Sequence, residues 1–197
     1  MNLETIGVVE RLQVHLADLK LGEPPYDPSR LASIDELWLT ARGCIAGFRR
    51  AHVLDSHHLD YPGPRRHANS PERVVSIGFT SHHRRIDQIF GTDRGANAGE
   101  NIVVTSSRGF GRADLAGGVA IMGNHAPVWL RDLAVAQPCL QFTQHVMHTD
   151  ETEPDRLSEG LALLSKGVRG FVCGLPHLDR PVVIRVGDEV VRSVSDA

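Results

Sequence analysis

The sequence of 197 residues predicts a mainly β fold, a barrel or sandwich with a few helices packed at its edge. Short segments rich in Val and Ile recur along the chain, and turns containing Gly or Pro separate them. Helical patterns are few and do not alternate one for one with the strands, which argues against a doubly wound α/β fold. The length and the apolar content of 41% suit a single domain over residues 1–197 with a sizeable core.

The N-terminal part of the chain predicts strands separated by two polar loops. Residues 6–16 (IGVVERLQVHL) are rich in Val and Leu and indicate a strand. Residues 22–29 (GEPPYDPS) indicate a loop, because three prolines and a glycine interrupt any regular pattern. Residues 34–48 indicate a strand that is broken at Gly43. The polar segment 57–72 contains three prolines and predicts a long exposed loop, either mobile or forming part of a site.

The next part predicts a strand, a helix and a glycine-bearing turn. Residues 73–79 (RVVSIGF) indicate a buried strand. Ser81 is expected to cap a short helix over residues 82–90, and Gly91 is expected to end it. Residues 94–107 indicate a turn that enters another strand.

The C-terminal part predicts four strands and the clearest helix. The helix covers residues 153–167, because a proline suits its first turn, leucines recur at helical spacing and a glycine ends it. A bulge is expected at Arg131–Asp132 and a turn or bulge at Gly187–Asp188. The strands are predicted over residues 117–123, 126–139, 169–175 and 181–191.

Charge and composition narrow the expected partners and compartment. A net charge of −3 does not favour nucleic acid or an anionic membrane as a partner. The arginine doublets 49–50, 65–66 and 84–85 are each expected at the surface. The sequence contains no signal peptide pattern and no apolar stretch of about 20 residues. A reducing cytoplasm is therefore expected, where Cys44, Cys139 and Cys173 stay free thiols.

Histidine is frequent, with eleven residues, and two pairs are adjacent in the sequence. The pairs are His57–His58 and His82–His83. Neighbouring side chains point apart in a strand and diverge in a helix, so such pairs rarely bind one metal ion. We expect both pairs in surface loops.

Cys139 allows three interpretations. It follows Pro138 at the predicted end of a strand, where a side chain can project into a cleft. It is a small buried hydrophobe, a zinc ligand together with His145 and His148, or a reactive thiolate. A zinc site needs four ligands, and the fourth is not evident. The residues considered for it are Asp150, Glu151 and Cys173.

The segment 95–101 (GANAGEN) is a phosphate-binding loop or a tight turn. Glycine lets backbone N–H groups approach an anion, but the segment lacks the motifs of the common nucleotide-binding loops. The sequence also lacks GxSxG, HExxH and CxxC motifs. Asp27, Asp87 and Asp188 form no evident carboxylate pair, so no residue pattern supports a hydrolase.

Four segments, taken in order, resemble the MOSC family, which is named for the C-terminal domain of molybdenum-cofactor sulfurase. AGENIVV resembles the Gly-Glu-Asn turn and strand of that family, and the block that ends in AQPCLQF resembles its Pro-Cys segment. LLSKGVRGFVCGL with PVVIRVGDEV resembles the closing helix and strands, and ELWLTARGCIAGFRR is a looser match. The resemblance covers roughly residues 6–192, with an inserted loop at about 57–72.

The resemblance implies a MOSC-like β-barrel with a few peripheral helices. It implies that Cys139 is the catalytic residue, either as the thiolate ligand of the metal in a molybdenum cofactor or as a sulfur carrier. Family members that hold molybdenum reduce N-hydroxylated compounds, so a small-molecule substrate and a redox partner or a sulfur donor protein are implied. Pyridoxal phosphate is not expected. The residues expected to bind the cofactor are Arg49, Arg50, Arg94, Glu100, Asn101 and Arg169.

A second class of function stays open at this point. Ala136 and Phe48 stand where the family often has an arginine and an aspartate. These departures favour a non-catalytic β-barrel that binds a small molecule or a protein and has lost the cofactor.

Overall fold

Strand β1 (Asn2–His15) organises the fold, because it pairs with three other strands along its length. The computed structural model describes residues 2–22, 25–123, 127–148, 154–165 and 167–194. The first half of β1 pairs with β12 (Glu189–Val194), and the second half pairs with β7 (Ile102–Val104) and β2 (Leu31–Ile34). All three pairings are antiparallel.

The pairing of β12 with β1 closes a barrel. Within the described part of the chain, seven strands follow one another in the order β12-β8-β9-β10-β6-β7-β1, and β2 extends the sheet beyond β1. The pair β6–β7 is parallel, and the other pairs of the barrel are antiparallel. Within this order, β6 covers Val75–Phe79, β8 covers Val119–Met122, β9 covers Pro127–Val135 and β10 covers Phe171–Gly174. The mainly β class predicted from the sequence is confirmed.

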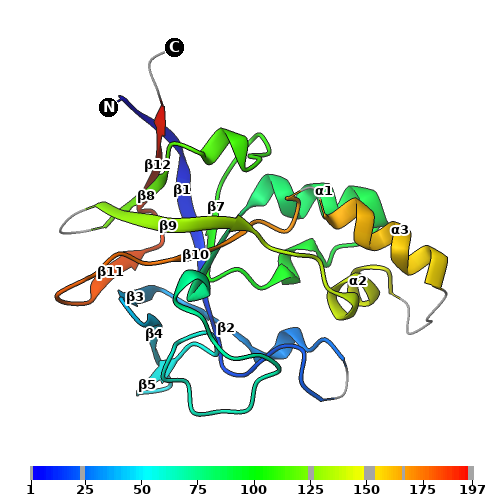
Figure 1. Ribbon diagram of the computed structural model, residues 1–197, viewed down its shortest axis with the longest axis horizontal. Helices are drawn as coiled ribbons and strands as arrows, with labels where there is room; N and C mark the ends of the chain where they lie inside the picture. Colours follow the sequence, from blue (N-terminus) through cyan, green and yellow to red (C-terminus); the bar gives the residue numbers. More distant parts are fainter. Residues whose placement is uncertain (1, 23–24, 124–126, 149–153, 166, 195–197) are drawn as a thin grey trace.

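A smaller antiparallel sheet lies below the barrel in Figure 1. Its order is β11-β3-β4-β5, with β11 at Val182–Arg185, β3 at Glu36–Thr40, β4 at Gly43–Phe48 and β5 at Ala51–Leu54. The single broken strand predicted over residues 34–48 is therefore wrong. Thr40 pairs with Gly43, so the chain reverses between them and forms a hairpin.

Three α-helices are present in the described residues, and they lie beside the barrel on the right of Figure 1. They are α1 (Thr80–Phe90), α2 (Leu140–Val146) and α3 (Pro154–Leu164). Short 3-10 helices occur at η1 (Pro28–Arg30), η2 (Pro71–Arg73), η3 (Gly95–Ala98) and η4 (Ala113–Leu115). Helix α2 was not predicted from the sequence, because its apolar residues follow a segment that we interpreted as the end of a strand.

The predicted ends of helix α1 are right at one end and wrong at the other. Gly91 ends the helix in the left-handed conformation, with φ of 60°, as predicted. The helix begins after Phe79 and has no side-chain cap. Ser81 lies inside the first turn, and its hydroxyl is buried without a hydrogen-bond partner in the described residues.

The irregularities predicted near the C-terminus are confirmed. The register between β9 and β10 shifts between Val172 and Gly174, and Asp132 has a positive φ of 53°, so a bulge lies at the predicted position. Gly187, with φ of 95°, lies in the turn between β11 and β12. Helix α3 matches the predicted C-terminal helix.

Side chains from alternating positions of the strands fill the barrel. In β6, Val75, Ile77 and Phe79 are buried in the main apolar cluster, whereas Ser76 faces outward and is partly exposed. A second apolar cluster lies among the helices and contains Ile86, Phe142 and other buried side chains. The outer face of the barrel therefore has its own packed layer, and functional side chains can lie between the two clusters.

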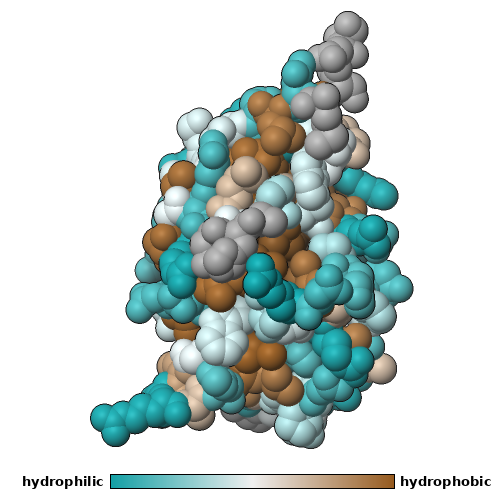
Figure 2. Space-filling view, turned by 90° about the vertical axis from the view of Figure 1, so that its left-hand side faces the viewer, coloured by the Kyte–Doolittle hydropathy of each residue, from teal (hydrophilic) through white to brown (hydrophobic). Residues whose placement is uncertain are grey.

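The surface shows separated apolar side chains. In Figure 2 brown residues run down the face toward the viewer, and teal residues interrupt them. The large hydrophobic side chains exposed among the described residues are Leu3, Val8, Leu140, Leu163 and Val186. Scattered exposure of this kind is ordinary for a folded protein. None of the helices described is long and apolar enough to span a membrane.

A Gly7→Ala substitution should destabilise the barrel. Gly7 lies at the bulge of β1, with φ of 155°, and a Cβ atom there would lie 2.1 Å from the carbonyl oxygen of Thr105. The change should lower the free energy of unfolding by about 1–3 kcal/mol, measured by urea denaturation. Gly47→Ala is the control, because a Cβ atom at Gly47 meets nothing within 4 Å. Equal effects of the two substitutions would contradict the prediction.

Candidate functional site

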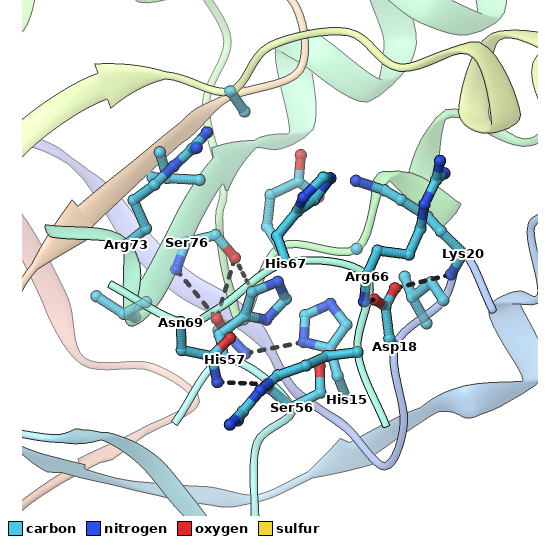
Figure 3. A pocket seen from close by; sticks show the side chains of 18 of the residues that line it. His15, Asp18, Lys20, Ser56, His57, Arg66, His67, Asn69, Arg73 and Ser76 are labelled. Carbon is cyan, nitrogen blue, oxygen red and sulfur yellow. Dashed lines mark hydrogen bonds between the residues drawn. The ribbon is translucent and has the colours of Figure 1, made fainter. Parts of the chain in front are cut away.

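A pocket of about 280 Å³ lies on the outer face of the barrel, between the strands and the loops that cover them (Figure 3). Its floor includes Ser76 of β6 and Val172 of β10, which pair with each other and face outward. The turn before β7 and the segment after β9 form further parts of the wall. The predicted loop over residues 57–72 forms one complete side of it, so its site-forming interpretation agrees with its position.

The carboxylate of Asp55 joins three segments of the chain beneath this pocket. Asp55 is fully buried and directly follows β5. One oxygen accepts hydrogen bonds from the backbone N–H of His15 at 2.7 Å and from the amide of Asn101 at 2.8 Å, and it lies 2.8 Å from His15 Nδ1. The other oxygen accepts from the backbone N–H of His57 at 2.8 Å and lies 3.0 Å from His57 Nδ1. Both imidazole rings therefore present the same nitrogen to one carboxylate.

The surroundings of Asp55 favour its ionised form. Burial by itself would raise the pKa of this carboxyl, but the charge of His15 and the hydrogen bonds from His15 and His57 hold it well below its usual range. Burial would lower the pKa of His15, and the charge of Asp55 together with its hydrogen bond raises that pKa above the ordinary value. Both shifts favour the charged forms of the two groups, which lie 2.8 Å apart.

Asn101 connects the Asp55 cluster to the floor of the pocket. Its side-chain oxygen accepts hydrogen bonds from the backbone N–H and the hydroxyl of Ser76, both at 3.0 Å. Its amide nitrogen donates to Asp55 and, at 3.3 Å, to the carbonyl of Gln13. The side chain is 1% exposed, so these bonds replace those it would make with water.

Glu100 is a buried carboxylate in the wall of the same pocket. One oxygen lies 3.1 Å from Nε2 of His83, and the other is buried with no hydrogen-bond partner among the described residues. Burial would raise the pKa of Glu100, but the charge and hydrogen bond of His83, its own backbone N–H and the charge of Arg169 lower it. The residue opposite must be glycine, because a Cβ atom on Gly78 would lie 2.7 Å from this carboxylate.

Several hydrogen bonds fix the loop over residues 57–72, the covering loop of the pocket, in place. The backbone N–H of Arg66 donates to Asp18 at 3.0 Å, and the same carboxylate accepts from the backbone N–H of Lys20 (Figure 3). The side-chain amide of Asn69 donates to the carbonyls of Ser56 and His58, at 2.9 and 2.7 Å. The loop is therefore attached both at its base and near its tip.

Cationic side chains outnumber carboxylates among the described residues that line the pocket. The lysine and arginine residues among the described lining are Lys20, Arg65, Arg66, Arg73 and Arg169. The lining carboxylates are Asp18 and Glu100, and each already has hydrogen-bond donors of the protein. This distribution favours an anionic ligand.

Arg169 is the buried member of the cationic set, with 8% of its surface exposed. Its guanidinium donates to the carbonyls of Gln137 at 3.2 Å and Ala98 at 3.1 Å, and it lies 4.3 Å from the centre of the Phe142 ring. Its Nε atom is buried without a partner among the described residues. Two polar atoms near the pocket are thus buried without a partner among the described residues, a donor on Arg169 and an acceptor on Glu100.

Cys139 lies beside Arg169, outside the lining of the pocket. Its sulfur is 3.7 Å from Nη1 of Arg169, and it packs partly buried against the helical apolar cluster. Its predicted position at the end of a strand is wrong, because β9 ends at Val135 and Cys139 is the residue before helix α2. Arg169, which lines the pocket, therefore contacts the thiol directly.

The zinc interpretation of Cys139 is not supported by the positions of its partners. His145 bonds to the amide of Asn97 at 3.1 Å, and His148 bonds to the hydroxyl of Thr92 at 2.8 Å. Among the described residues, the group with metal-binding spacing is formed elsewhere, by His15, Asp55 and His57. Of the fourth ligands considered, Cys173 is buried in the barrel core, and Asp150 and Glu151 lie outside the described residues.

The prediction that the histidine pairs lie in surface loops is wrong for three of the four residues. His82 and His83 are buried in the first turns of α1, where they bond to Phe110 and Glu100. His58 is also buried, and only His57 is exposed. Their hydrogen bonds explain the difference, because a buried imidazole needs partners. His82 and His83 find them on distant segments, whereas His58 accepts from the backbone N–H of Asp60.

The structure brings together some of the residues predicted to bind a cofactor. Glu100, Asn101 and Arg169 line the pocket. Arg49 and Arg50 are exposed at the tip of the β4–β5 hairpin, away from the lining. Arg94 donates to the carbonyl of His145 at 2.8 Å and holds α2 against η3.

Sequence reasoning did not select most of the cationic and imidazole groups of the pocket. His15 was placed inside an ordinary strand, and Asp55 stood in no recognised motif. Arg65 and Arg66 were interpreted as an isolated surface doublet. The concentration of histidine, arginine and proline in residues 57–72 was the available signal, because a long polar loop often forms a site.

Comparison with known proteins finds the fold among solved structures. The search of family models gives no match, and the search of curated proteins gives none. The crystal structure of the YuaD protein from Bacillus subtilis aligns with a TM-score of 0.60 and 19% identity, over 98% of this chain and 99% of that one. A crystal structure of a hypothetical protein aligns with a TM-score of 0.55 and 14% identity, over 98% and 71% of the two chains. YiiM from Escherichia coli aligns with a TM-score of 0.46 and 14% identity, over 84% and 66%.

The two alignments with TM-scores of 0.60 and 0.55 show the class of fold. YuaD is a MOSC-family structure, and its likeness covers nearly the whole of both chains. The closed barrel and this likeness fit a MOSC-like fold, in agreement with the order of motifs in the sequence.

A Glu100→Gln substitution should destabilise the protein more at pH 6.5 than at pH 3.5. A carboxyl whose pKa is lowered by folding contributes stability above its unfolded pKa, and that stability is lost as the pH falls through the folded pKa. The loss at pH 6.5 should be about 3 kcal/mol, measured by urea denaturation. Glu159→Gln on the exposed face of α3 is the control and should have little effect. An effect of Glu100→Gln that does not change with pH would contradict the prediction.

Proposed function

We propose that the chain binds an anionic small molecule, with a phosphate or similar oxyanion, in the pocket on the outer face of the barrel. The observation that carries the proposal is the excess of cationic groups over carboxylates in the lining. Arg65 and Arg66 come from the covering loop, Lys20 from the loop after β1, and Arg169 from the segment before β10. An oxyanion can therefore accept charge-assisted hydrogen bonds from several sides.

The molybdenum cofactor is the ligand that the MOSC-like fold suggests, and the pocket meets one of its two requirements. The cationic lining suits its phosphate. The cofactor also requires a thiolate facing the metal, and Cys139 lies beside Arg169, outside the lining. In this arrangement the pocket suits the anionic part of the cofactor and does not present a thiolate to its metal.

Two more specific functions, reduction of an N-hydroxylated compound and sulfur transfer, depend on Cys139. Reduction of an N-hydroxylated compound with a separate redox protein requires Cys139 as a metal ligand, and sulfur transfer requires it to carry a persulfide. The partly buried position of Cys139 beside Arg169 favours an alternative, a binding barrel that takes an anion and does not use this thiol. The two classes of function differ in what loss of the thiol should change.

Inorganic pyrophosphate should bind to the purified protein, and Arg66→Gln should weaken its binding about threefold to tenfold. The change removes one charged donor from the covering loop, and charge-assisted hydrogen bonds are worth about 1.5–3 kcal/mol before screening by solvent. Isothermal titration at low and moderate salt measures the affinity, which should fall as salt rises. Arg156→Gln on the exposed face of α3 is the matched control. No binding to the wild-type protein, or an equal loss with Arg156→Gln, would overturn the proposal.

A Cys139→Ser substitution should separate the cofactor and sulfur-transfer proposals from the binding-barrel alternative. If Cys139 is a metal ligand or sulfur carrier, molybdenum content or persulfide mass should fall to background, because serine lacks a soft thiolate. Molybdenum is measured after expression in a host that makes the cofactor, and persulfide by mass spectrometry after incubation with a sulfur donor. Cys44→Ala and Cys173→Ala are controls, because both thiols are buried in the barrel core. Retention of both signals in Cys139→Ser, or their absence from the wild-type protein, would support the alternative.

A further inference from the structure

We infer that His15, Asp55 and His57 form a binding site for one divalent transition-metal ion at the edge of the pocket. This site is separate from Cys139 and does not depend on the proposed anionic ligand. The three residues come from the end of β1 and from the start of the covering loop, so folding brings them together. One ligand atom from each of them lies within 4.8 Å of the other two.

The orientation of the rings provides the first argument. Both histidines direct Nδ1 to the carboxylate, at 2.8 Å for His15 and 3.0 Å for His57. Zinc bonds of about 2.0–2.1 Å in a tetrahedral arrangement separate neighbouring ligand atoms by roughly 3.3 Å. A metal ion therefore requires each ring nitrogen to move away from the carboxylate by a few tenths of an ångström, and the two ring nitrogens, which lie within 4.8 Å of each other, to take up the same spacing. It would replace the ring protons that now lie between these atoms.

The remaining hydrogen bonds of Asp55 provide the second argument. When a metal replaces the ring protons, the carboxylate still accepts from the backbone N–H groups of His15 and His57 and from the amide of Asn101. Ligands of metal sites in proteins are held by such outer hydrogen bonds, which fix their orientation before the metal binds. Here Asn101 is itself fixed by Ser76 on the floor of the pocket.

Access and charge provide the third argument. His15 is 2% exposed, whereas the side chain of His57 is 49% exposed and lies on the wall of the pocket. An ion can therefore enter from the pocket and keep positions open toward it. Figure 3 shows the two rings side by side at this wall. The carboxylate of Asp55 supplies a negative charge that offsets part of the charge of the ion.

The ligand set determines the class of metal. Two imidazoles and one carboxylate suit zinc, iron(II) and related first-row ions, whereas magnesium and calcium prefer oxygen ligands alone. A set of three protein ligands with open positions is typical of sites at which the metal also contacts a bound molecule. Here His15 and His57 line the same pocket as the cationic residues.

The test is a titration of the full chain with metal alone, in buffer without phosphate. After treatment with a chelator, wild-type protein should bind one equivalent of zinc in isothermal titration, with a dissociation constant in the micromolar range or below. Cobalt(II) should give the visible absorption bands of a metal ion with low coordination number, such as a tetrahedral one. His57→Ala should weaken binding at least tenfold and remove the bands. Because His57 is half exposed, this variant should keep its fold, which circular dichroism checks.

His52→Ala is the matched control, because His52 is an exposed histidine on β5, away from the pocket. It should bind zinc as the wild-type protein does. The proposal is overturned if wild-type protein binds no stoichiometric zinc, if His57→Ala binds as tightly as wild type, or if His52→Ala loses as much. The zinc titration contains neither phosphate nor pyrophosphate, and the pyrophosphate titration contains no added metal. Failure of either titration therefore leaves the result of the other unaffected.

Discussion

The buried carboxylate of Asp55 is the interaction on which the arrangement of the pocket depends. A buried ionised carboxylate is costly unless charged or polar groups surround it, and breaking such a pair leaves an uncompensated charge. The partners of Asp55 come from the end of β1, from the turn before β7 and from the covering loop. Each segment must therefore stay in place for the charge to be compensated, and the carboxylate fixes the loop against the outer face of the barrel.

The barrel creates the conditions for this arrangement. Alternating residues of β6 and β10 fill the interior, so the outward positions Ser76 and Val172 are left to form a floor. The helices pack their own apolar cluster beside that floor. Polar side chains can then lie between two apolar layers, where hydrogen bonds are strong and unpaired groups are expensive. The partnerless atoms of Glu100 and Arg169 belong to this set of buried polar groups.

Sequence patterns predicted the class of fold better than the details of the site. The repeated short strands, the bulge near Asp132 and the C-terminal helix follow from local patterns of apolar residues, glycine and proline, and these local rules hold in the structure. Helix α2 was missed because its short apolar pattern follows a strand without a clear start signal. The roles of His15 and Asp55 depend on contacts between residues 40 positions apart in the sequence, which no local pattern encodes. Glu100 and Asn101 were selected because a motif marked them, whereas the cations of the covering loop belong to an insertion without a motif.

Arg169 lies both in the lining of the pocket and beside the Cys139 thiol. Its guanidinium already donates to two backbone carbonyls and lies against Phe142, so its orientation is fixed before any ligand binds. Its unpartnered Nε is buried, so an anion in the cavity can bond to that atom only if neighbouring groups move. The same guanidinium lies 3.7 Å from the Cys139 sulfur, and Cys139 is not among the residues that line the cavity. Direct use of the thiol by a pocket ligand therefore requires the chain around Cys139 or Arg169 to rearrange, and the hydrogen bonds that fix Arg169 oppose such a change.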